Sequence, residues 1–345
     1  MTANEHDPGA DSVLRFELPD PLLAASVKAG LDRVEDVLHT VVDSDVEFVR
    51  STALHLVDAG GKRIRPLFTL LAAQFGEPDR QDVITAAAAV ELVHIATLYH
   101  DDVMDEATMR RGAISANARW DNTVAILAGD YLFAHASRLV SDLGTDAARI
   151  IAETFAELVT GQLRETIGPG PDDDPIAHYL SVIDQKTGSL IATAGRFGGM
   201  CAGAADEHVT ALRRFGEIVG TAFQISDDVI DIASPAAESG KTPGTDLREG
   251  VHTLPTLYAL AKDDPADPGD RDGVRLRALL GRPLTEDDEV TEALALLRES
   301  PALSRARKTL ADYADQARDV LRLLPDGPAS EALRAMTDYL VDRTG

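Results

Sequence analysis

The sequence has a single cysteine, few aromatic residues and far fewer positive than negative charges. The lone Cys201 cannot form an intrachain disulfide or a cysteine metal cluster, and we expect it to be a small buried residue. The formal net charge of −25 disfavours binding to nucleic acid or to anionic membranes. No run reaches the roughly 18 apolar residues that span a bilayer, and the N-terminus does not resemble a signal peptide. We therefore expect a cytoplasmic protein without an integral membrane segment.

Alanine and leucine dominate the sequence, whereas the alternating β-branched residues typical of half-buried strands are scarce. With 345 residues, of which 44% are hydrophobic, the chain can bury a large core. This pattern predicts an all-α protein. Residues 1–19 are polar and contain glycine and proline, which predicts a flexible N-terminal tail. No later stretch resembles a linker, so we expect residues 20–345 to form one domain.

An apolar run from Ala86 to Tyr99 leads directly into the acidic residues Asp101, Asp102 and Asp105. We expect a central helix over residues 82–110, on which the i, i+4 spacing of Asp101 and Asp105 places both carboxylates on one face. Mg²⁺ suits such a pair, because it takes one or two carboxylates together with waters and phosphate oxygens. The alternative interpretation is a solvated acidic face.

A helix is predicted over residues 176–202, with Lys186 and Thr187 in its middle. A second acidic stretch, FQISDDVID, lies in a helix predicted over residues 207–232. The spacing of Gln224, Asp227 and Asp231 places these three side chains on one face. A third Asp-Asp-x-x-Asp match at residues 263–267 contains a proline and is predicted to lie in a loop, so we assign it no function.

The motif GGKRIRP, from Gly60 to Pro66, precedes another apolar helix. Its two glycines allow the backbone to approach a ligand closely, and its three cations lie at a helix start, where free N–H groups also favour an anion. Alone, such a turn is more often a solvated surface. Together with two acidic helices, each followed by cationic residues, it predicts a site for phosphate groups and Mg²⁺.

These motifs, with RRG, LAGDYL, QKTGSL and GKTPGTDLREG, occur in the order typical of the trans-isoprenyl diphosphate synthases, the polyprenyl synthetase family, which the chain resembles from about Leu22 to Arg343. The resemblance implies a single-domain helical bundle around a deep apolar cavity, the isoprenoid synthase fold, usually as a homodimer. It implies that isopentenyl diphosphate is condensed head to tail with an allylic diphosphate, in the trans configuration, with the help of three Mg²⁺ ions.

The resemblance also implies roles for individual residues. The Mg²⁺ ligands would be Asp101, Asp102, Asp105, Asp227, Asp228 and Asp231. The allylic diphosphate would contact Arg110, Lys186, Thr187, Gln224 and Lys241. Isopentenyl diphosphate would contact Lys62, Arg65, His94 and Arg111. The residues expected to carry the chemistry are Asp101, Asp105, Lys186, Asp227 and Lys241. One departure is Val251, which stands where many members carry a second lysine, so that Lys241 acts alone or His252 assists it.

Product length in this family depends on the bulk of residues just before the first acidic motif. Ala96 and Thr97 are both small here, which predicts a long-chain product of the kind used for quinone side chains. Tyr99 could itself narrow the cavity, and a short- or medium-chain product such as farnesyl or geranylgeranyl diphosphate is the alternative.

Two other functions agree less well with these motifs. A class I terpene cyclase needs no pocket for a second diphosphate, and its second metal motif typically mixes Asn, Ser or Thr with Glu. A non-catalytic regulatory subunit would be expected to lack some acidic ligands, whereas both acidic clusters are intact here.

Overall fold

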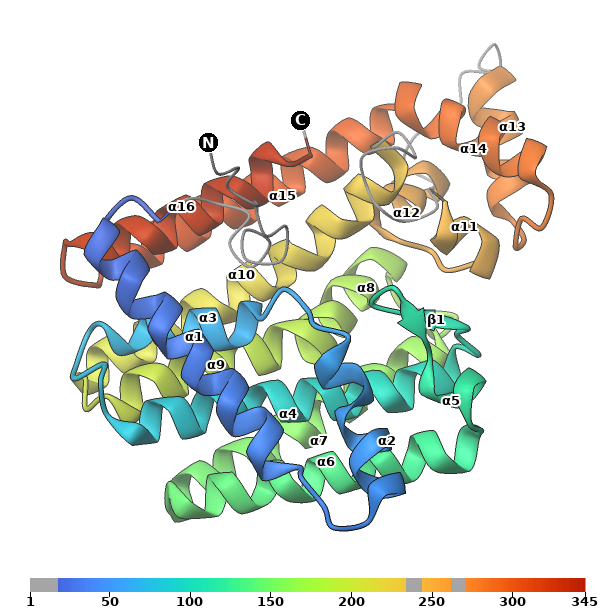
Figure 1. The fold of residues 1–345 in the computed structure, drawn as a ribbon. Helices are drawn as coiled ribbons and strands as arrows, with labels where there is room; N and C mark the ends of the chain where they lie inside the picture. The colour runs from blue at the N-terminus through green and yellow to red at the C-terminus, as the bar shows by residue number, and fades with distance from the viewer. Residues whose placement is uncertain (1–17, 234–243, 262–270, 345) are drawn as a thin grey trace, which may run out of the picture. The chain divides into compact units, whose positions relative to one another are not determined.

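The computed structural model describes residues 18–233, 244–261 and 271–344, and most of them lie in helices (Figure 1). The first part of the chain forms α1 (Pro21–Val41), α2 (Glu47–Asp58), α3 (Ile64–Ala73), α4 (Gln81–Met104), α5 (Ala116–Arg119), α6 (Asn122–Asp142) and α7 (Thr145–Ile167). The second part forms α8 (Pro175–Ile183), the π-helix η1 (Asp184–Gly188), α9 (Ser189–Cys201), α10 (Asp206–Ala233), α11 (Thr245–Glu249), α12 (Leu254–Leu260), α13 (Arg271–Leu280), α14 (Asp287–Glu299), α15 (Pro301–Leu321) and α16 (Pro328–Asp342). The described strands are β1 (Met109–Arg110) and β2 (Ala113–Ile114), which pair in an antiparallel hairpin. The all-α prediction is confirmed.

Helix starts follow from local sequence. Asp20 caps α1, because its side chain accepts a hydrogen bond from the backbone N–H of Leu23 at 2.7 Å, and a proline follows it in the first turn. Asp121 caps α6 in the same way by accepting from the backbone N–H of Val124 at 2.8 Å. Each cap satisfies an N–H group that has no partner within its own helix.

The chain divides into two compact units, which are described separately. Unit 1 comprises Met1–Ala156, Leu190–Gly216 and Leu321–Ala335. Unit 2 comprises Glu157–Ser189, Glu217–Val320 and Met336–Gly345. The prediction of one catalytic domain over residues 20–345, preceded by a tail, stays a prediction.

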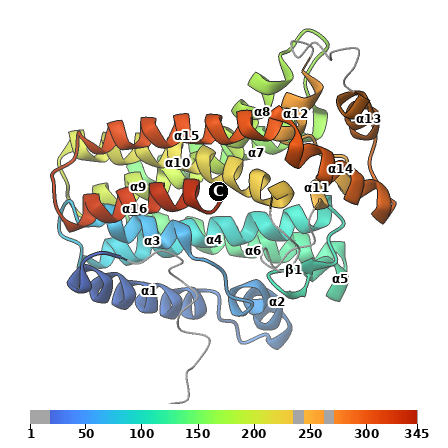
Figure 2. The same ribbon diagram turned by 90° about the horizontal axis from the view of Figure 1, so that it is seen from above.

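In unit 1, α4 is the central core helix. It packs against α1, α3 and α6, and Figures 1 and 2 show α1 running along one side of α3 and α4. The four consecutive alanines 86–89 are fully buried, because neighbours cover α4 on every side. By length and composition α4 is long and apolar enough to cross a membrane, but 72% of its most apolar window is buried in the structure. A long apolar helix that is mostly buried by the rest of the protein is typical of a protein core.

The close contact between α4 and α6 depends on Gly129 of the LAGDYL motif. A Cβ atom added at Gly129 would lie 2.3 Å from His100 Nε2 and 3.1 Å from the Ala96 carbonyl oxygen. Any larger side chain would force the two helices apart at the level of the acidic end of α4.

In unit 2, α12 packs against α8, α13 and α14, and α13 and α14 lie side by side (Figure 2). The helix α8 begins with the pair Asp174 and Pro175, and the Asp174 side chain accepts from the backbone N–H of Ile176 at 2.9 Å. The chain then continues without a break through η1 into α9.

Two expectations about helix boundaries were wrong. The central helix ends at Met104 rather than near Arg110, because the chain turns at Glu106, whose φ of 50° is left-handed, and enters the β1–β2 hairpin. The continuous α-helix expected over residues 176–202 is interrupted by η1, since residues 184–188 adopt the wider π-helical turn.

Candidate active site

The acidic end of α4 combines buried and accessible carboxylates. Asp102 is fully buried, and its Oδ1 accepts a hydrogen bond from Arg110 Nε at 2.5 Å. Burial raises the pKa of Asp102, and the neighbouring Arg110 partly opposes that shift. Asp101 is half-buried, whereas the Asp105 side chain is 48% exposed. Asp102 therefore anchors Arg110, whereas Asp105 is the most exposed of the three carboxylates.

The RRG motif forms the turn of the β1–β2 hairpin. Arg111 and Gly112 both have positive φ angles, 53° and 77°, as expected for a two-residue turn that follows the twist of its strands. The turn directs the two arginines differently. Arg110 pairs with Asp102, while Arg111 NH1 donates hydrogen bonds to the carbonyl oxygens of Leu56, at 3.0 Å, and Gly60.

Arg65, His94 and Arg111, which the sequence assigned to one pocket, lie close together. Arg65 is half-buried, its Nε has no hydrogen-bond partner, and burial lowers its pKa to about 10. Burial and the surrounding arginines hold the pKa of His94 well below its ordinary value, so His94 is a neutral imidazole. Lys62, in the same motif, is exposed. A concentration of guanidinium groups with an unpartnered N–H is suited to an anion such as a phosphate.

The second acidic region lies on the part of α10 that belongs to unit 2. Asp228 is buried and accepts hydrogen bonds from the Tyr179 hydroxyl and, at 3.0 Å, from Gln224 Nε2. Burial, with Asp246 nearby, raises the pKa of Asp228 to about 8. Asp227 is more accessible and forms an ion pair with Arg343 at 2.9 Å. Asp228 is thus a buried, hydrogen-bonded carboxylate, as Asp102 is on α4.

The π-helix η1 carries the QKTGSL residues. Lys186 Nζ pairs with Glu165 Oε2 of α7 at 2.5 Å, and Thr187 Oγ1 donates to Gln224 Oε1 at 3.4 Å. Thr187 and Gln224 are therefore together, whereas Lys186 is held by a carboxylate that the sequence did not single out. Lys241 lies outside the described residues, as does the acidic loop at residues 263–267.

The carboxylates fit a hard divalent cation such as Mg²⁺. The donors are oxygens only, and Asp101 and Asp105 are one helical turn apart, with the Asp105 N–H bonded to the Asp101 carbonyl at 2.8 Å. In the described part of the chain, no three His, Cys, Asp or Glu side chains gather closely enough to hold a metal alone. The acidic residues of α4 belong to unit 1 and those of α10 to unit 2, so their joint action on one ligand stays a prediction.

The residues assigned to product length differ in their surroundings. Ala96 and Thr97 are buried, and the Thr97 hydroxyl donates to the His94 carbonyl at 2.8 Å. The Tyr99 hydroxyl is engaged with α2: it donates to the Thr52 carbonyl at 2.5 Å and accepts from the Leu56 N–H at 3.2 Å. Tyr99 therefore connects α4 to α2, an explanation for this residue that the sequence did not provide.

Sequence reasoning missed the partners of the motif residues, which are Glu35, Glu91, Glu165, Tyr179 and Arg343. Only Glu91 carried a sequence signal, because it is the one acidic residue inside the apolar run from Ala86 to Tyr99. The others come from distant segments whose polar residues look like ordinary surface residues.

An all-α fold with aspartate-rich helix segments and an arginine pocket is typical of enzymes that act on diphosphates. The polyprenyl synthetase family model matches residues 46–297. Nonaprenyl diphosphate synthase of Mycobacterium tuberculosis is 58% identical, over 97% of this chain and 99% of its own length. Dimethylallyltranstransferase of the same organism is 47% identical, over 94% of this chain and 97% of its own length.

A solved structure gives the same result. Geranylgeranyl pyrophosphate synthase from Corynebacterium glutamicum, complexed with calcium and isoprenyl diphosphate, is 52% identical with a TM-score of 0.84, and the match covers 95% of this chain and 99% of that one. The chain belongs to the polyprenyl synthetase family, and it is a prenyltransferase of the trans-polyprenyl diphosphate synthase class.

Proposed function

We propose that this enzyme adds isopentenyl diphosphate units to an allylic diphosphate and releases a long-chain all-trans polyprenyl diphosphate for a quinone side chain. The observation that carries the proposal is the 58% identity, over 97% of the chain, to a nonaprenyl diphosphate synthase. The charged residues around Arg65 and at the end of α4 support it, since they are of the types that bind diphosphates.

In this proposal, one group of side chains binds isopentenyl diphosphate and another binds the allylic diphosphate. Lys62, Arg65 and Arg111, with neutral His94, bind isopentenyl diphosphate without a metal, by charge-assisted hydrogen bonds. The allylic diphosphate is held by Arg110, Lys186, Thr187, Gln224 and Lys241. The cations among them, Arg110, Lys186 and Lys241, stabilise the negative charge that develops on the leaving diphosphate.

We also propose that the reaction requires a divalent metal, in the form of three Mg²⁺ ions. These ions would be held by Asp101, Asp105 and Asp227, with Asp102, Asp228 and Asp231 in support. The metal supplies Lewis acidity to the departing diphosphate. The structure of the related enzyme from C. glutamicum, which contains calcium and isoprenyl diphosphate, supports a divalent cation in this role. The side chains of this protein orient the diphosphate and keep water away from the allylic cation.

A shorter product is the second candidate. The related geranylgeranyl pyrophosphate synthase from C. glutamicum is 52% identical, and its name refers to a shorter product. The small side chains of Ala96 and Thr97 favour the long product, and the engagement of Tyr99 with α2 removes one argument for a narrowed cavity.

One experiment tests activity and product length together. The purified protein is incubated with Mg²⁺, labelled isopentenyl diphosphate and farnesyl diphosphate, and the dephosphorylated products are sized. We expect a ladder ending in long chains. Products ending at the geranylgeranyl length would establish the shorter alternative, consumption of farnesyl diphosphate alone would indicate a cyclase, and no turnover would refute the proposed activity.

A substitution at Ala96 tests the origin of chain length. Ala96→Tyr adds bulk beside the first acidic motif and is expected to shorten the product ladder. Thr97→Val is the matched control, because it removes a hydroxyl without adding volume and should leave the ladder unchanged. An unaltered ladder in Ala96→Tyr would show that Ala96 does not limit the growing chain.

We further propose that the enzyme acts in the cytoplasm as a homodimer of single catalytic domains. Exposed apolar side chains on α6, Ile126 at 43% and Leu127 at 61%, support a partner surface there. Light scattering of the purified protein measures the assembly, and a monomeric mass at working concentration would refute it.

A further inference from the structure

Glu91 is a buried acid to which the functions above assign no role. It lies inside the apolar core helix α4, and its side chain is only 2% exposed. Placing an ionised carboxylate in such surroundings is strongly unfavourable unless cations and hydrogen bonds compensate it. Its neighbours therefore indicate why the residue is there.

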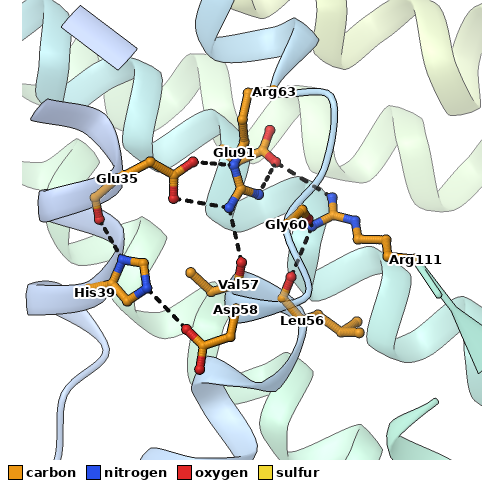
Figure 3. Close-up of polar contacts among 9 residues, drawn as sticks. All are labelled: Glu35, His39, Leu56, Val57, Asp58, Gly60, Arg63, Glu91 and Arg111. Atoms are coloured by element: carbon orange, nitrogen blue, oxygen red, sulfur yellow. Dashed lines mark hydrogen bonds and ion pairs between the residues drawn. The ribbon is translucent and has the colours of Figure 1, made fainter. Parts of the chain in front are cut away.

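Two arginines meet on this carboxylate, as Figure 3 shows. Arg63 NH1 lies 3.0 Å from Glu91 Oε1, and Arg111 NH2 lies 3.6 Å from the same oxygen. The first arginine comes from the loop between α2 and α3 and the second from the β1–β2 turn. Glu91 thus joins two loops to the core helix.

The remaining contacts of the two arginines differ. Arg63 also pairs with Glu35 of α1, at 2.5 and 3.1 Å, and donates to the Val57 carbonyl at 3.1 Å, so its hydrogen-bonding capacity is largely used within the protein (Figure 3). The hydrogen bonds of Arg111 go instead to backbone carbonyls, those of Leu56 and Gly60. Glu91 is the carboxylate that Arg111 contacts.

Both arginines have left-handed backbone conformations, with φ angles of 44° at Arg63 and 53° at Arg111. Such angles are uncommon for residues other than glycine: Arg111 adopts its angle in the β1–β2 turn, and Arg63 adopts its angle just before the first turn of α3. In the described part of the chain, Glu106 is the one other non-glycine residue with positive φ. Two of the three described non-glycine residues with positive φ therefore contact Glu91 through their side chains.

The charges around Glu91 also indicate that its carboxylate acts on the neighbouring arginines. The pKa of Arg65 is lowered mainly by burial and also by Arg111, whereas Glu91 opposes the shift. Without a buried negative charge, Arg63, Arg65 and Arg111 would repel one another before any anion arrives. Glu91 offsets that repulsion and still leaves Arg65 Nε without a partner.

We propose that Glu91 is a positioning residue for the isopentenyl diphosphate pocket. Its carboxylate contacts both Arg63 and Arg111, and it thereby holds Arg111 in the orientation that binds the diphosphate. The inference rests on the proposed function for the identity of the substrate. It does not require Glu91 to touch the substrate, and it assigns Arg63 to support rather than to binding.

Glu91→Gln tests this role, because glutamine keeps the size of the side chain and removes its charge. We expect the KM for isopentenyl diphosphate to rise about tenfold or more, as for other broken buried charge pairs, with little change in the KM for the allylic substrate. Glu35→Gln is the matched control. It removes the other carboxylate from Arg63 but no contact of Arg111, so it should lower the melting temperature and leave both KM values nearly unchanged.

A binding measurement separates this inference from the proposed function. Calorimetric titration of inorganic pyrophosphate in EDTA reports on the metal-independent arginine pocket. We expect weaker binding in Glu91→Gln but not in Glu35→Gln, even if the wild-type protein should fail to turn over prenyl substrates. If Glu91→Gln does not fold, Glu91→Asp, which keeps the charge on a shorter side chain, should show the same selective loss. Equal or tighter pyrophosphate binding in the Glu91 variant, or an equal loss in both variants, would overturn the proposal.

Discussion

Removing Arg110 should destabilise the protein as well as lower its activity. Asp102 is fully buried, and Arg110 Nε, at 2.5 Å, is its cationic partner. Arg110→Met keeps much of the apolar stem but leaves the carboxylate buried without compensation. Asp102 Oδ2 has no hydrogen-bond partner among the described residues, so the second carboxylate oxygen does not replace the lost contact.

The magnitude follows from the burial of the two partners. Breaking a buried ion pair by removing one member costs about 3–5 kcal/mol. Because the Arg110 side chain is 29% exposed, water can enter the space that it leaves, and we expect about 2–3 kcal/mol. Neutralising the carboxylate as well should recover part of this loss, since the double variant, Asp102→Asn with Arg110→Met, no longer buries a charge that needs a partner.

Thermal unfolding in EDTA measures the effect without a contribution from bound metal. A chain of this size should lose about 2 °C per kcal/mol, so Arg110→Met should melt about 4–6 °C lower than the wild type. The exposed Arg334 on α16 provides the control variant Arg334→Met, which should change the melting temperature little. A loss below about 1 °C in Arg110→Met, or full additivity in the double variant, would refute the argument from a buried pair.

Two other predictions concern buried polar groups. Tyr99→Phe should cost about 1–3 kcal/mol in chemical denaturation, because two hydrogen bonds between α4 and the backbone of α2 are lost, and it should not change the product ladder. A changed ladder would place Tyr99 beside the growing chain instead. Burial raises the pKa of Asp228 from 3.8 to about 8, so the folded state retains a proton that the unfolded state releases above about pH 4. The stability of the metal-free protein should therefore fall between about pH 4 and pH 8, and a melting series in which Asp228→Asn falls just as steeply would contradict this assignment.

The main helices could be predicted because each carries its own signals. The apolar run of α4, the caps at Asp20 and Asp121 and the glycines of GGKRIRP act over a few residues and fix local conformation. The end of α4 could not be predicted, because the residues after Met104 remain compatible with a helix. What ends the helix is the turn at Glu106 and the pairing of β1 with β2, a contact between segments.

The π-helix η1 escaped prediction for a different reason. A π turn changes the backbone register within an otherwise helical pattern, so the periodicity of the flanking apolar residues stays close to that of an α-helix. Its position coincides with Lys186 and Thr187, and the contact with α7 is tight, since a Cβ at Gly161 would lie 2.8 Å from the Lys186 backbone nitrogen. The irregular turn therefore lies at the residues to which the family resemblance assigns the allylic diphosphate.

The GGKRIRP motif illustrates what can be predicted from a motif and what only the structure shows. Arg63 and Arg65 are two residues apart, have the same side chain and belong to one motif. Yet Arg63 is engaged by Glu35 and Glu91, whereas Arg65 Nε is buried without a partner. Arg63 precedes α3 with a left-handed backbone, whereas Arg65 lies in its first turn. Only the distant acids that meet Arg63 identify it as support. A motif therefore selects the region that binds an anion, and the burial and pairing of each cation decide which of them is left to bind it.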